Sequence, residues 1–196
     1  MNIGDFLYLR GFGAFEGYSQ QVKEQVEDLI KLTTNSHINV MEIGFNAGHS
    51  ADVFLKNNPT LTLTSFDLGC HDYVRHGKEY IDSTYPNRHT LILGDSTVTV
   101  PNYIADNQGK TFEVIFIDGG HDYEVAKADL ENCMKLANKY TIVIVDDVIF
   151  MKELEQEYTK GPTQAWLEFI SNGKVTETNH KYYHYGRGMV WGNYKN

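Results

Sequence analysis

The feature that most constrains this chain is a regular alternation of short apolar runs with helical patterns. Amphipathic helical patterns cover residues 19–33, 48–58, 122–137 and 161–170. The runs have strand length and carry apolar residues on both faces, at residues 38–44, 61–68, 89–96, 112–119 and 140–148. Strands of this kind, separated by helices, are typical of a parallel sheet that helices cover on both sides. The sequence therefore predicts a three-layer α/β sandwich.

The same patterns predict where several helices begin. Ser19 and Asp122 precede two of the helical patterns, and we expect both side chains to cap the helices that follow. Pro162 is expected in the first turn of the last helix. Residues 71–85 are polar and aromatic and indicate a loop with a short helix. The chain closes with two further segments that look like longer strands, at 174–185 and 188–194.

Length, charge and cysteine content limit the class of protein. A chain of 196 residues suits one domain, residues 1–196, with a sizeable core. The net charge of −9 argues against a nucleic-acid backbone or an anionic membrane as the main partner. Two cysteines form no disulfide framework, and neither a signal-peptide pattern nor a membrane-length apolar run is present. These features predict a cytoplasmic protein.

Acidic residues gather at the predicted strand ends. They are Glu42, Asp67, Asp95, Asp118, Asp146 and Asp147. In open parallel sheets, ligands bind beyond the carboxyl ends of the strands. Since a buried strand can end in an acid where its tip meets a ligand crevice, these side chains predict the position of the site.

The first three strand ends predict a ligand with hydroxyls and a positive charge. Gly44 and Gly48 give the spacing G-x-x-x-G, which matches neither the dinucleotide pattern nor the phosphate loop with its lysine. Asp67 can accept hydrogen bonds from a ribose diol, and Asp95 with Ser96 can face an adenine edge. Each residue alone is also consistent with an ordinary turn or cap. Together, without a basic partner, they disfavour a phosphate.

The fourth and fifth strand ends predict a metal site. Carboxylates of Asp118, Asp146 and Asp147 would repel one another unless protons or a cation neutralised them. Mg²⁺ prefers oxygen ligands and keeps positions open for substrate. His121, after two glycines, can accept a proton from a substrate hydroxyl near neutral pH. The alternatives are that one acid of the Asp146–Asp147 pair is a loop cap and that His121 is structural.

Several segments resemble the class I S-adenosylmethionine-dependent methyltransferases. They are VMEIGFNAGHS, SFDLG, LILGDS, FIDGGHDYE and IVIVDDV, within a resemblance that covers residues 20–196. The tail segments GPTQAW and GRGMVWGNY resemble the small-molecule O-methyltransferase branch that includes the macrolide-sugar (macrocin-type) enzymes. The resemblance implies a Rossmann-like, mostly parallel seven-stranded sheet, into which the final hairpin inserts one antiparallel strand.

The resemblance also implies a role for each motif position. It assigns Asp67 to the ribose, Asp95 and Ser96 to the adenine, and the methionine portion of the cofactor to Glu42, Gly44, Asn46, Gly48 and Ser50. It makes Asp118, Asp146 and Asp147 the metal ligands and His121 the base, with Asp118 also beside the cofactor. Catechol-type relatives carry Asn where Asp147 stands.

We therefore expect an S-adenosylmethionine-dependent, Mg²⁺-dependent O-methyltransferase that acts on a small hydroxylated molecule, such as a sugar or a catechol. The alternatives are an NAD-dependent oxidoreductase, which the glycine spacing disfavours, a non-catalytic nucleotide-binding or assembly protein, and a metal-dependent hydrolase. Residues 1–33 would form an N-terminal lid and the first helix. The aromatic segment 6–20 within them is consistent either with a lid over the cofactor or with a contact in a homo-oligomer.

Overall fold

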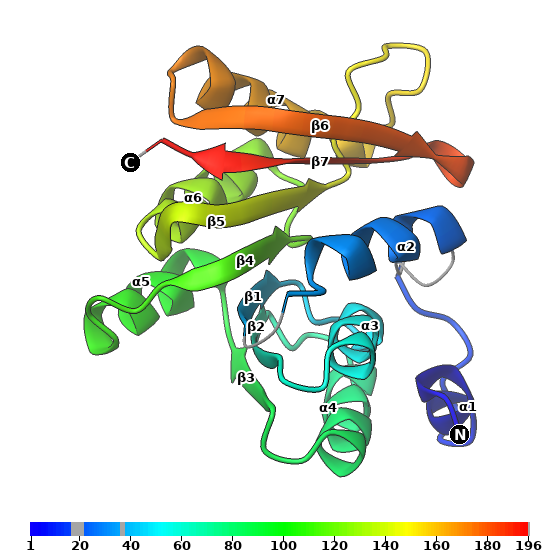
Figure 1. Ribbon diagram of the computed structural model, residues 1–196. Coiled ribbons are helices and arrows are strands. Elements are labelled where there is room, and N and C mark those ends of the chain that lie inside the picture. Colours follow the sequence, from blue (N-terminus) through cyan, green and yellow to red (C-terminus); the bar gives the residue numbers. More distant parts are fainter. Residues whose placement is uncertain (17–21, 36–37, 196) are drawn as a thin grey trace.

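The structure of the chain, a computed structural model, describes residues 1–16, 22–35 and 38–195. A seven-stranded sheet with the order β3-β2-β1-β4-β5-β7-β6 runs through it (Figure 1). The strands are β1 (Asn39–Ile43), β2 (Thr62–Asp67), β3 (His89–Leu93), β4 (Phe112–Ile117), β5 (Ala137–Asp146), β6 (Val175–Tyr183) and β7 (Arg187–Tyr194). Neighbours from β3 to β5 are parallel, whereas β7 is antiparallel to both β5 and β6. The predicted sheet is confirmed.

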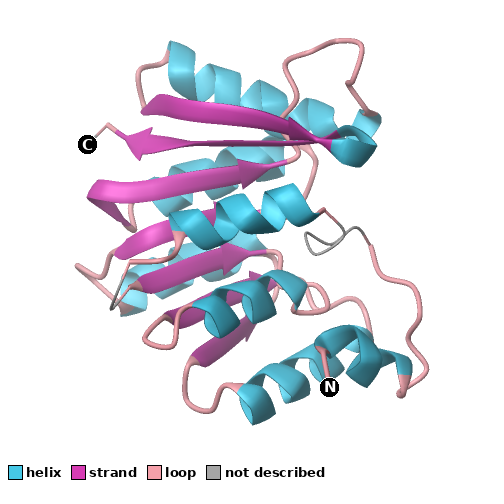
Figure 2. Cartoon of the chain, turned by 45° about the vertical axis from the view of Figure 1, so that its right-hand side comes forward, coloured by secondary structure: helices cyan, strands magenta, loops and turns pink. Residues whose placement is uncertain are grey.

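Helices cover both faces of the sheet, as Figure 2 shows. One layer contains α1 (Ile3–Tyr8), α2 (Lys23–Leu32), α3 (His49–Asn57) and α4 (Tyr73–Thr84), and the other contains α5 (Ser96–Asp106), α6 (Tyr123–Met134) and α7 (Glu157–Ser171). Successive strand side chains alternate between two cores, so that Phe116 packs towards α3 and Ile117 towards α6 and α7. The predicted three-layer sandwich is confirmed. Among the described residues, no helix is long and apolar enough to cross a membrane.

Two helix starts differ from the prediction, and a third agrees with it in position but lacks the predicted capping hydrogen bond. Helix α7 begins at Glu157, so Pro162 lies inside the helix rather than in its first turn. The polar residues that open α7 hid its first turn from the apolar pattern. Asp122 does occupy the cap position of α6, but its side chain makes no capping hydrogen bond. Helix α2 begins after Val22, and Ser19, the predicted cap, lies outside the described residues.

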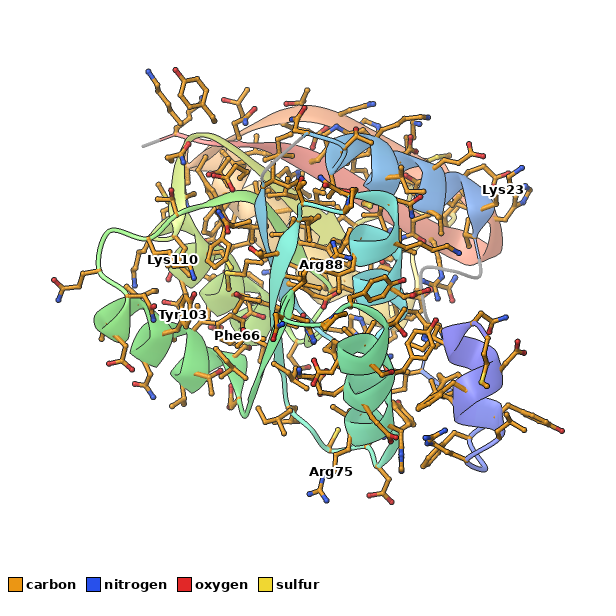
Figure 3. All side chains as sticks on the ribbon, turned by 60° about the horizontal axis from the view of Figure 1, so that its bottom comes forward. Lys23, Phe66, Arg75, Arg88, Tyr103 and Lys110 are labelled. Atoms are coloured by element: carbon orange, nitrogen blue, oxygen red, sulfur yellow. The ribbon has the colours of Figure 1, made fainter. Side chains whose placement is uncertain are left out.

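Helix α5 has no counterpart among the predicted helices. Its first half is rich in β-branched residues and it contains Pro101, both of which weaken the helical signal. Asp95 begins the helix by accepting the backbone N–H of Thr97 at 2.9 Å. The ring of Tyr103 in α5 meets that of Phe66 in β2 edge-on, with ring centroids 5.5 Å apart. Both side chains are labelled in Figure 3. This packing fixes the helix start beside the tips of the central strands.

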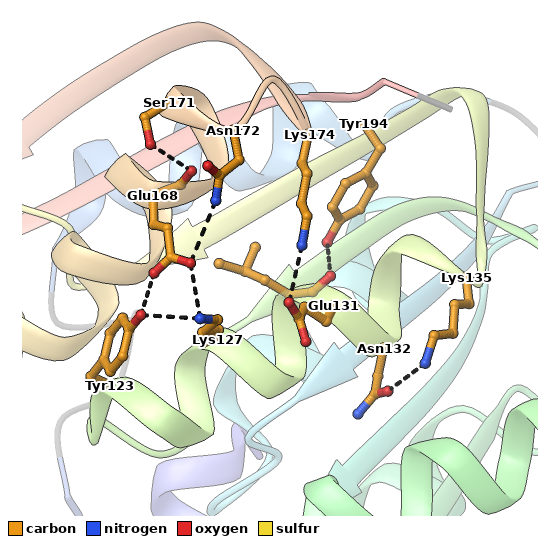
Figure 4. A network of polar contacts seen from close by, with 11 residues as sticks. Tyr123, Lys127, Glu131, Asn132, Lys135, Glu168, Ser171, Asn172, Lys174 and Tyr194 are labelled. Atoms are coloured by element: carbon orange, nitrogen blue, oxygen red, sulfur yellow. Dashed lines mark hydrogen bonds and ion pairs between the residues drawn. The ribbon is translucent and has the colours of Figure 1, made fainter.

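A polar network fixes α6, the helix that follows the tip of β4 (Figure 4). The Tyr123 hydroxyl donates to Glu168 of α7, and Lys127 pairs with the same carboxylate at 2.9 Å. Further along α6, Glu131 pairs with Lys174 at 3.0 Å. These contacts tie α6 to α7 and to the chain after it, so the turn before α6 starts from a fixed helix.

Candidate functional site

The candidate site lies at the carboxyl ends of the central strands. In the register, Ile43 of β1 pairs with Ile117 of β4, and Ile117 pairs with Val145 of β5. Residues that directly follow these positions therefore meet at one edge of the sheet. We call Glu42, Gly44, Asn46, Gly48, Ser50 and Asp67 the turn half-site, and Asp118, His121, Asp146 and Asp147 the acid half-site.

A glycine joins the two half-sites. Gly44 has φ +97°, a region that favours glycine, and a Cβ there would lie 1.8 Å from the carbonyl oxygen of Asp118. The turn after β1 therefore rests directly on the backbone that carries the acid half-site. The two glycines of G-x-x-x-G therefore have different structural roles. Gly44 allows the close contact with Asp118, and Gly48 is the N-cap residue of α3 in a left-handed conformation.

Asp67 has its carboxylate held by two backbone donors. The Asn46 N–H donates to Oδ2 at 2.7 Å, and the Gly69 N–H donates to Oδ1 at 2.7 Å. Each oxygen keeps a further lone pair, which is what a ribose diol requires. The ribose contact stays a prediction, and the structure fixes the carboxylate from which it would be made.

Glu42 and Ser50 hold each other beneath the glycine turn. The Glu42 side chain is fully buried and accepts hydrogen bonds from the Ser50 hydroxyl and, at 2.6 Å, from the Ser65 hydroxyl. Burial raises the pKa of Glu42 to about 7 despite these donors. Glu42 and Ser50, two of the residues that the resemblance assigned to the methionine portion, are therefore hydrogen-bonded to each other inside the protein, and direct contact with a cofactor stays a prediction for the whole set.

The N-terminal segment contacts this turn. The Asn46 side-chain amide donates to the carbonyl oxygen of Glu16 at 3.3 Å. The ring of Phe15 lies 5.2 Å from that of His49 and 5.3 Å from that of Tyr73. Phe15 and Glu16 thus lie beside the turn half-site, within the segment expected to form a lid, while 17–21 lie outside the described residues.

Asp95 and Ser96 stand at the start of α5. Asp95 is exposed and caps the helix, and hydrogen bonds from the side chain and the backbone of Thr97 lower its pKa. Ser96 is the first helical residue and is partly buried. Both predicted adenine residues therefore share one helix start, and their contact with a base stays a prediction.

Three side chains of the acid half-site come together. One ligand atom each from Asp118, His121 and Asp147 lies within 4.8 Å of the other two. The Nε2 atom of His121 is 3.1 Å from Oδ2 of Asp147. Asp147 has φ +58°, a left-handed conformation that costs energy in a residue other than glycine. Two carboxylates and an imidazole at this spacing suit a divalent cation.

The electrostatics of the acid half-site reflect mutual repulsion. Burial, followed by the charges of Asp146 and Asp147, raises the pKa of Asp118 well above its ordinary value. Burial, followed by the charge of Asp147, raises the pKa of Asp146 to about 7. The pKa of His121 is raised mainly by its hydrogen bond with Asp147. The positive charge of Arg187 opposes the shifts of Asp118 and Asp146 only in part, so protons or a further cation are needed to relieve this cluster at neutral pH.

Asp146 is placed differently from the other two predicted metal ligands. Its oxygens accept hydrogen bonds from the side-chain amide of Gln25 at 2.8 and 2.9 Å. Asp118 and Asp147 are instead grouped with His121, the predicted base. Within the described residues, the structure thus brings together two of the three predicted ligands and adds the imidazole. The ligand set itself stays a prediction.

Several residues around the site were not predicted. Gln25 belongs to the N-terminal helix α2, and its amphipathic pattern gave no sign of a partner on β5. Gly161 packs so closely that a Cβ would lie 2.1 Å from the carbonyl oxygen of His121. Glycine inside the apolar pattern of α7 was the available signal for this contact. The ring of Tyr158, in the first turn of the same helix, lies 5.7 Å from that of His121.

A buried carboxylate, Asp129, was also missed. It lies on α6 with no exposed surface, and neither oxygen has a hydrogen-bond partner among the described residues. Burial raises its pKa to about 7, and the nearby Ser96 hydroxyl opposes the shift only in part. A Cβ on Gly119 would lie 3.3 Å from its Oδ2 atom, so it sits directly behind the tip of β4.

Comparisons with known proteins were made against families and structures. A family model described as a methyltransferase domain matches residues 41–148. The fold resembles an O-methyltransferase from Bacillus cereus in complex with SAH, with 18% identity, a TM-score of 0.74, and coverage of 98% of this chain and 90% of that chain. A comparison with curated protein sequences gave no match.

Two further structures come from the biosynthesis of natural products. The TDP-rhamnose 3'-O-methyltransferase of calicheamicin biosynthesis has 21% identity and a TM-score of 0.66, over 88% of this chain and 78% of that chain. The O-methyltransferase TomG from Streptomyces achromogenes is involved in tomaymycin synthesis and was solved with SAM. It has 14% identity and a TM-score of 0.70, and the match covers 99% of this chain and 88% of that chain. At these identities the likeness is one of fold.

Proposed function

The chain belongs to the methyltransferase-domain family, whose model matches more than half of it, and from this premise we propose that it methylates a hydroxyl group of a small molecule. The predicted resemblance to class I S-adenosylmethionine-dependent methyltransferases is confirmed at the level of family and fold. We further propose that residues 1–196 act as one domain, with residues 1–33 as its lid and first helix, and that the reaction depends on Mg²⁺.

One observation carries the proposal. The group formed by Asp118, His121 and Asp147 stands beside the turn that Gly44 presses onto Asp118. The cluster to which we assign the cation therefore adjoins the place where the cofactor is expected. The raised pKa of Asp118 supports the same assignment, because a cation would remove the repulsion that causes it.

The residues of the acid half-site can bind and deprotonate an alcohol. A bound Mg²⁺ ion would supply Lewis-acid polarisation of the acceptor oxygen. If Asp147 accepts the Nε2–H of His121, the neutral imidazole has its lone pair on Nδ1. His121 can then take the hydroxyl proton at Nδ1, while Asp147 stabilises the imidazolium that forms.

The turn half-site would hold the methyl donor. S-adenosylmethionine supplies a methyl group on a sulfonium, a good leaving group. Asp67 would bind the ribose hydroxyls, while Asp95 and Ser96 would border the adenine, as the sequence predicts. Alignment of the two substrates accounts for much of the rate in such a transfer, roughly 7–11 kcal/mol of barrier when geometry is good.

The acceptor class is the least constrained part of the proposal. A vicinal diol, as in a sugar or a catechol, can chelate a cation with two oxygens. The structurally similar calicheamicin enzyme is a TDP-rhamnose 3'-O-methyltransferase, which supports a sugar as the acceptor for this chain.

Location and oligomeric state are further parts of the proposal. The two cysteines, Cys70 and Cys133, are both free, which supports the proposed cytoplasmic location. A homo-oligomer is part of the same proposal, and light scattering on the assay sample measures it.

The test combines a methyl-transfer assay with defined variants. Purified protein, stripped with EDTA, is given S-adenosylmethionine and a panel of sugars and catechols, with and without Mg²⁺. We expect methylation to require Mg²⁺ and to be lost in Asp118→Asn and His121→Ala. His180→Ala is the matched control. His180 lies on β6 and is not one of the candidate site residues, and its Nδ1 atom is 2.9 Å from Oε1 of Glu177. Methylation that persists in EDTA would contradict the metal dependence.

A further inference from the structure

The N-terminal helix α2 reaches into the acid half-site through one side chain. Gln25 is fully buried, and its Nε2 atom donates to both carboxylate oxygens of Asp146, at 2.8 and 2.9 Å. Its Oε1 atom has no hydrogen-bond partner within the described ranges. The contact with Asp146 is therefore the polar interaction that holds this amide in place. A buried amide seldom depends on a single partner group.

The contact continues from Asp146 to its neighbour. The backbone N–H of Asp147 donates to Oδ1 of Asp146 at 3.0 Å. Asp147 keeps its left-handed φ of +58° at this point, and its carboxylate turns towards His121 at 3.1 Å. A strained backbone persists only where its surroundings hold it. Asp146 is one such support, and Gln25 fixes Asp146.

We propose that Gln25 is a positioning residue, which fixes Asp146 and, through it, Asp147, so that the docking of α2 sets the affinity of the acid half-site for a divalent cation. The inference rests on the proposed metal dependence and adds a residue and an element to it. Residues that orient metal-binding carboxylates from behind commonly affect affinity by 10–100-fold.

The chemistry of the side chain suits this role. A neutral amide can donate to Asp146 without neutralising it, so the negative charge of the cluster remains available to a cation. A lysine at this position would compete with the cation, and an aliphatic side chain would leave a buried carboxylate with one donor fewer. Glutamine therefore orients Asp146 and preserves the charge on which cation binding depends.

Helix α2 has a second polar anchor that serves as a control. Asp28, also buried, accepts hydrogen bonds from Lys181 at 2.7 Å and from the Tyr183 hydroxyl at 3.0 Å. These partners lie on β6, and within the described residues no hydrogen bond joins either of them to Asp146, although the charge of Asp146 contributes to the raised pKa of Tyr183. Loosening α2 at Asp28 therefore tests docking alone, whereas a change at Gln25 tests docking together with the position of Asp146.

The experiment measures Mn²⁺ binding to the full chain by the loss of the free-ion EPR signal. Gln25→Met keeps the length and apolar volume of the side chain without its donor, and we expect it to weaken Mn²⁺ binding at least tenfold. Asp28→Asn should stay within about twofold of the wild type, even if its melting temperature falls. Affinity for S-adenosylhomocysteine, measured by calorimetry, should be unchanged in both variants.

Three results would overturn the inference. The first is Mn²⁺ binding by Gln25→Met equal to that of the wild type, which leaves the proposed function standing. The second is a loss of Mn²⁺ affinity in Asp28→Asn equal to that in Gln25→Met, which would mean that Gln25 acts only by docking α2. The third is a wild-type protein that binds no Mn²⁺, which would remove the proposed metal dependence as well. Should Gln25→Met fail to fold, Gln25→Leu gives the same comparison with a more compact side chain.

Discussion

The two half-sites treat their carboxylates in opposite ways. In the turn half-site, Glu42 and Asp67 each accept two hydrogen bonds from hydroxyl or backbone donors. In the acid half-site, burial and the charges of Asp146 and Asp147 raise the pKa of Asp118, and burial and the charge of Asp147 raise that of Asp146. The first arrangement is complete without a ligand. The second is completed by protons or by a cation, which is what the proposed chemistry uses.

The largest expected effect comes from the residue that joins the half-sites. Gly44→Ala would place a Cβ 1.8 Å from the Asp118 carbonyl at a φ of +97°. We expect the free energy of unfolding to fall by roughly 3 kcal/mol or more, from strain and overpacking together. Urea denaturation measures the loss.

A second glycine separates the two causes. Gly173 also has a positive φ, +67°, but an added Cβ would meet no atom within 4 Å. Gly173→Ala should therefore cost only about 1 kcal/mol, the backbone contribution. Equal losses in the two variants would mean that the contact between the half-sites carries no weight.

Asp129 is an exception that can break the comparison. It lies behind the tip of β4, yet its buried carboxylate accepts no well-formed hydrogen bond from the described residues, and burial raises its pKa to about 7 although the nearby Ser96 hydroxyl opposes the shift in part. Since the folded-state pKa lies above the unfolded value of 3.8, the folded protein holds this proton more tightly, and stability falls as pH rises from about 4 to about 7.

Asp129→Asn should remove that fall. A shift of this size converts to an upper bound of about 4 kcal/mol, and we expect the variant to gain about 2 kcal/mol at pH 8 and little at pH 4. Chemical denaturation at both pH values measures the difference. Glu42→Gln is the comparison, since its two hydroxyl donors should make the gain smaller. A gain at pH 8 no larger than at pH 4 would contradict the buried-charge explanation.

The sign of a charge-removing substitution should differ between the half-sites. Asp67→Asn replaces one accepting oxygen by an amide that faces a backbone N–H, and it should cost about 1–2 kcal/mol. Asp118→Asn removes a repelled charge, and it should stabilise the metal-free protein by about 1 kcal/mol at pH 8. Thermal denaturation in EDTA gives both values. The same sign for both variants would remove the distinction between the half-sites.

The smallest expected effect concerns His121. Its pKa is raised mainly by Asp147, so in EDTA the pair adds stability that is fully present below the unfolded pKa of 6.5 and is lost as pH rises through the folded pKa. Because the imidazole is about half exposed, the contribution should stay below about 1 kcal/mol. Asp147→Asn should lower the pKa of His121, as NMR titration of the ring protons would report. An unchanged titration would show that the hydrogen bond is not formed in solution.

The sequence was sufficient for the fold because its signals are local. Strands that are apolar on both faces, and the acids at their ends, are recognised from short stretches of sequence. The pairing of Ile117 with Val145 then brings Asp118 and Asp146 to the same edge of the sheet. Helix α5 was missed because β-branched residues and Pro101 conceal its pattern. Such a segment is helical because tertiary packing overrides its weak propensity.

The missed parts of the site are those that depend on distant partners. Gln25 meets a residue 121 positions later in the chain, and no spacing within α2 predicts that contact. Asp129 occupies a helix face that the pattern would assign to an ordinary polar residue, and only the packed structure shows that its carboxylate is buried and accepts no well-formed hydrogen bond from the described residues. The three metal ligands were predicted from their positions at strand ends. Those positions do not indicate that the Asp146 carboxylate bonds to Gln25 of α2.

The close packing of Gly161 divides helix α7 into two parts with different freedom to change. At Gly161, the helix touches the backbone of His121, and any larger residue would push His121, the proposed base, out of place. One turn earlier, Tyr158 is 38% exposed and lies beside the same imidazole. Variants designed for new acceptors should therefore change Tyr158 and keep Gly161. The same helix packs tightly against the His121 backbone at Gly161 and presents an exposed side chain beside the imidazole at Tyr158.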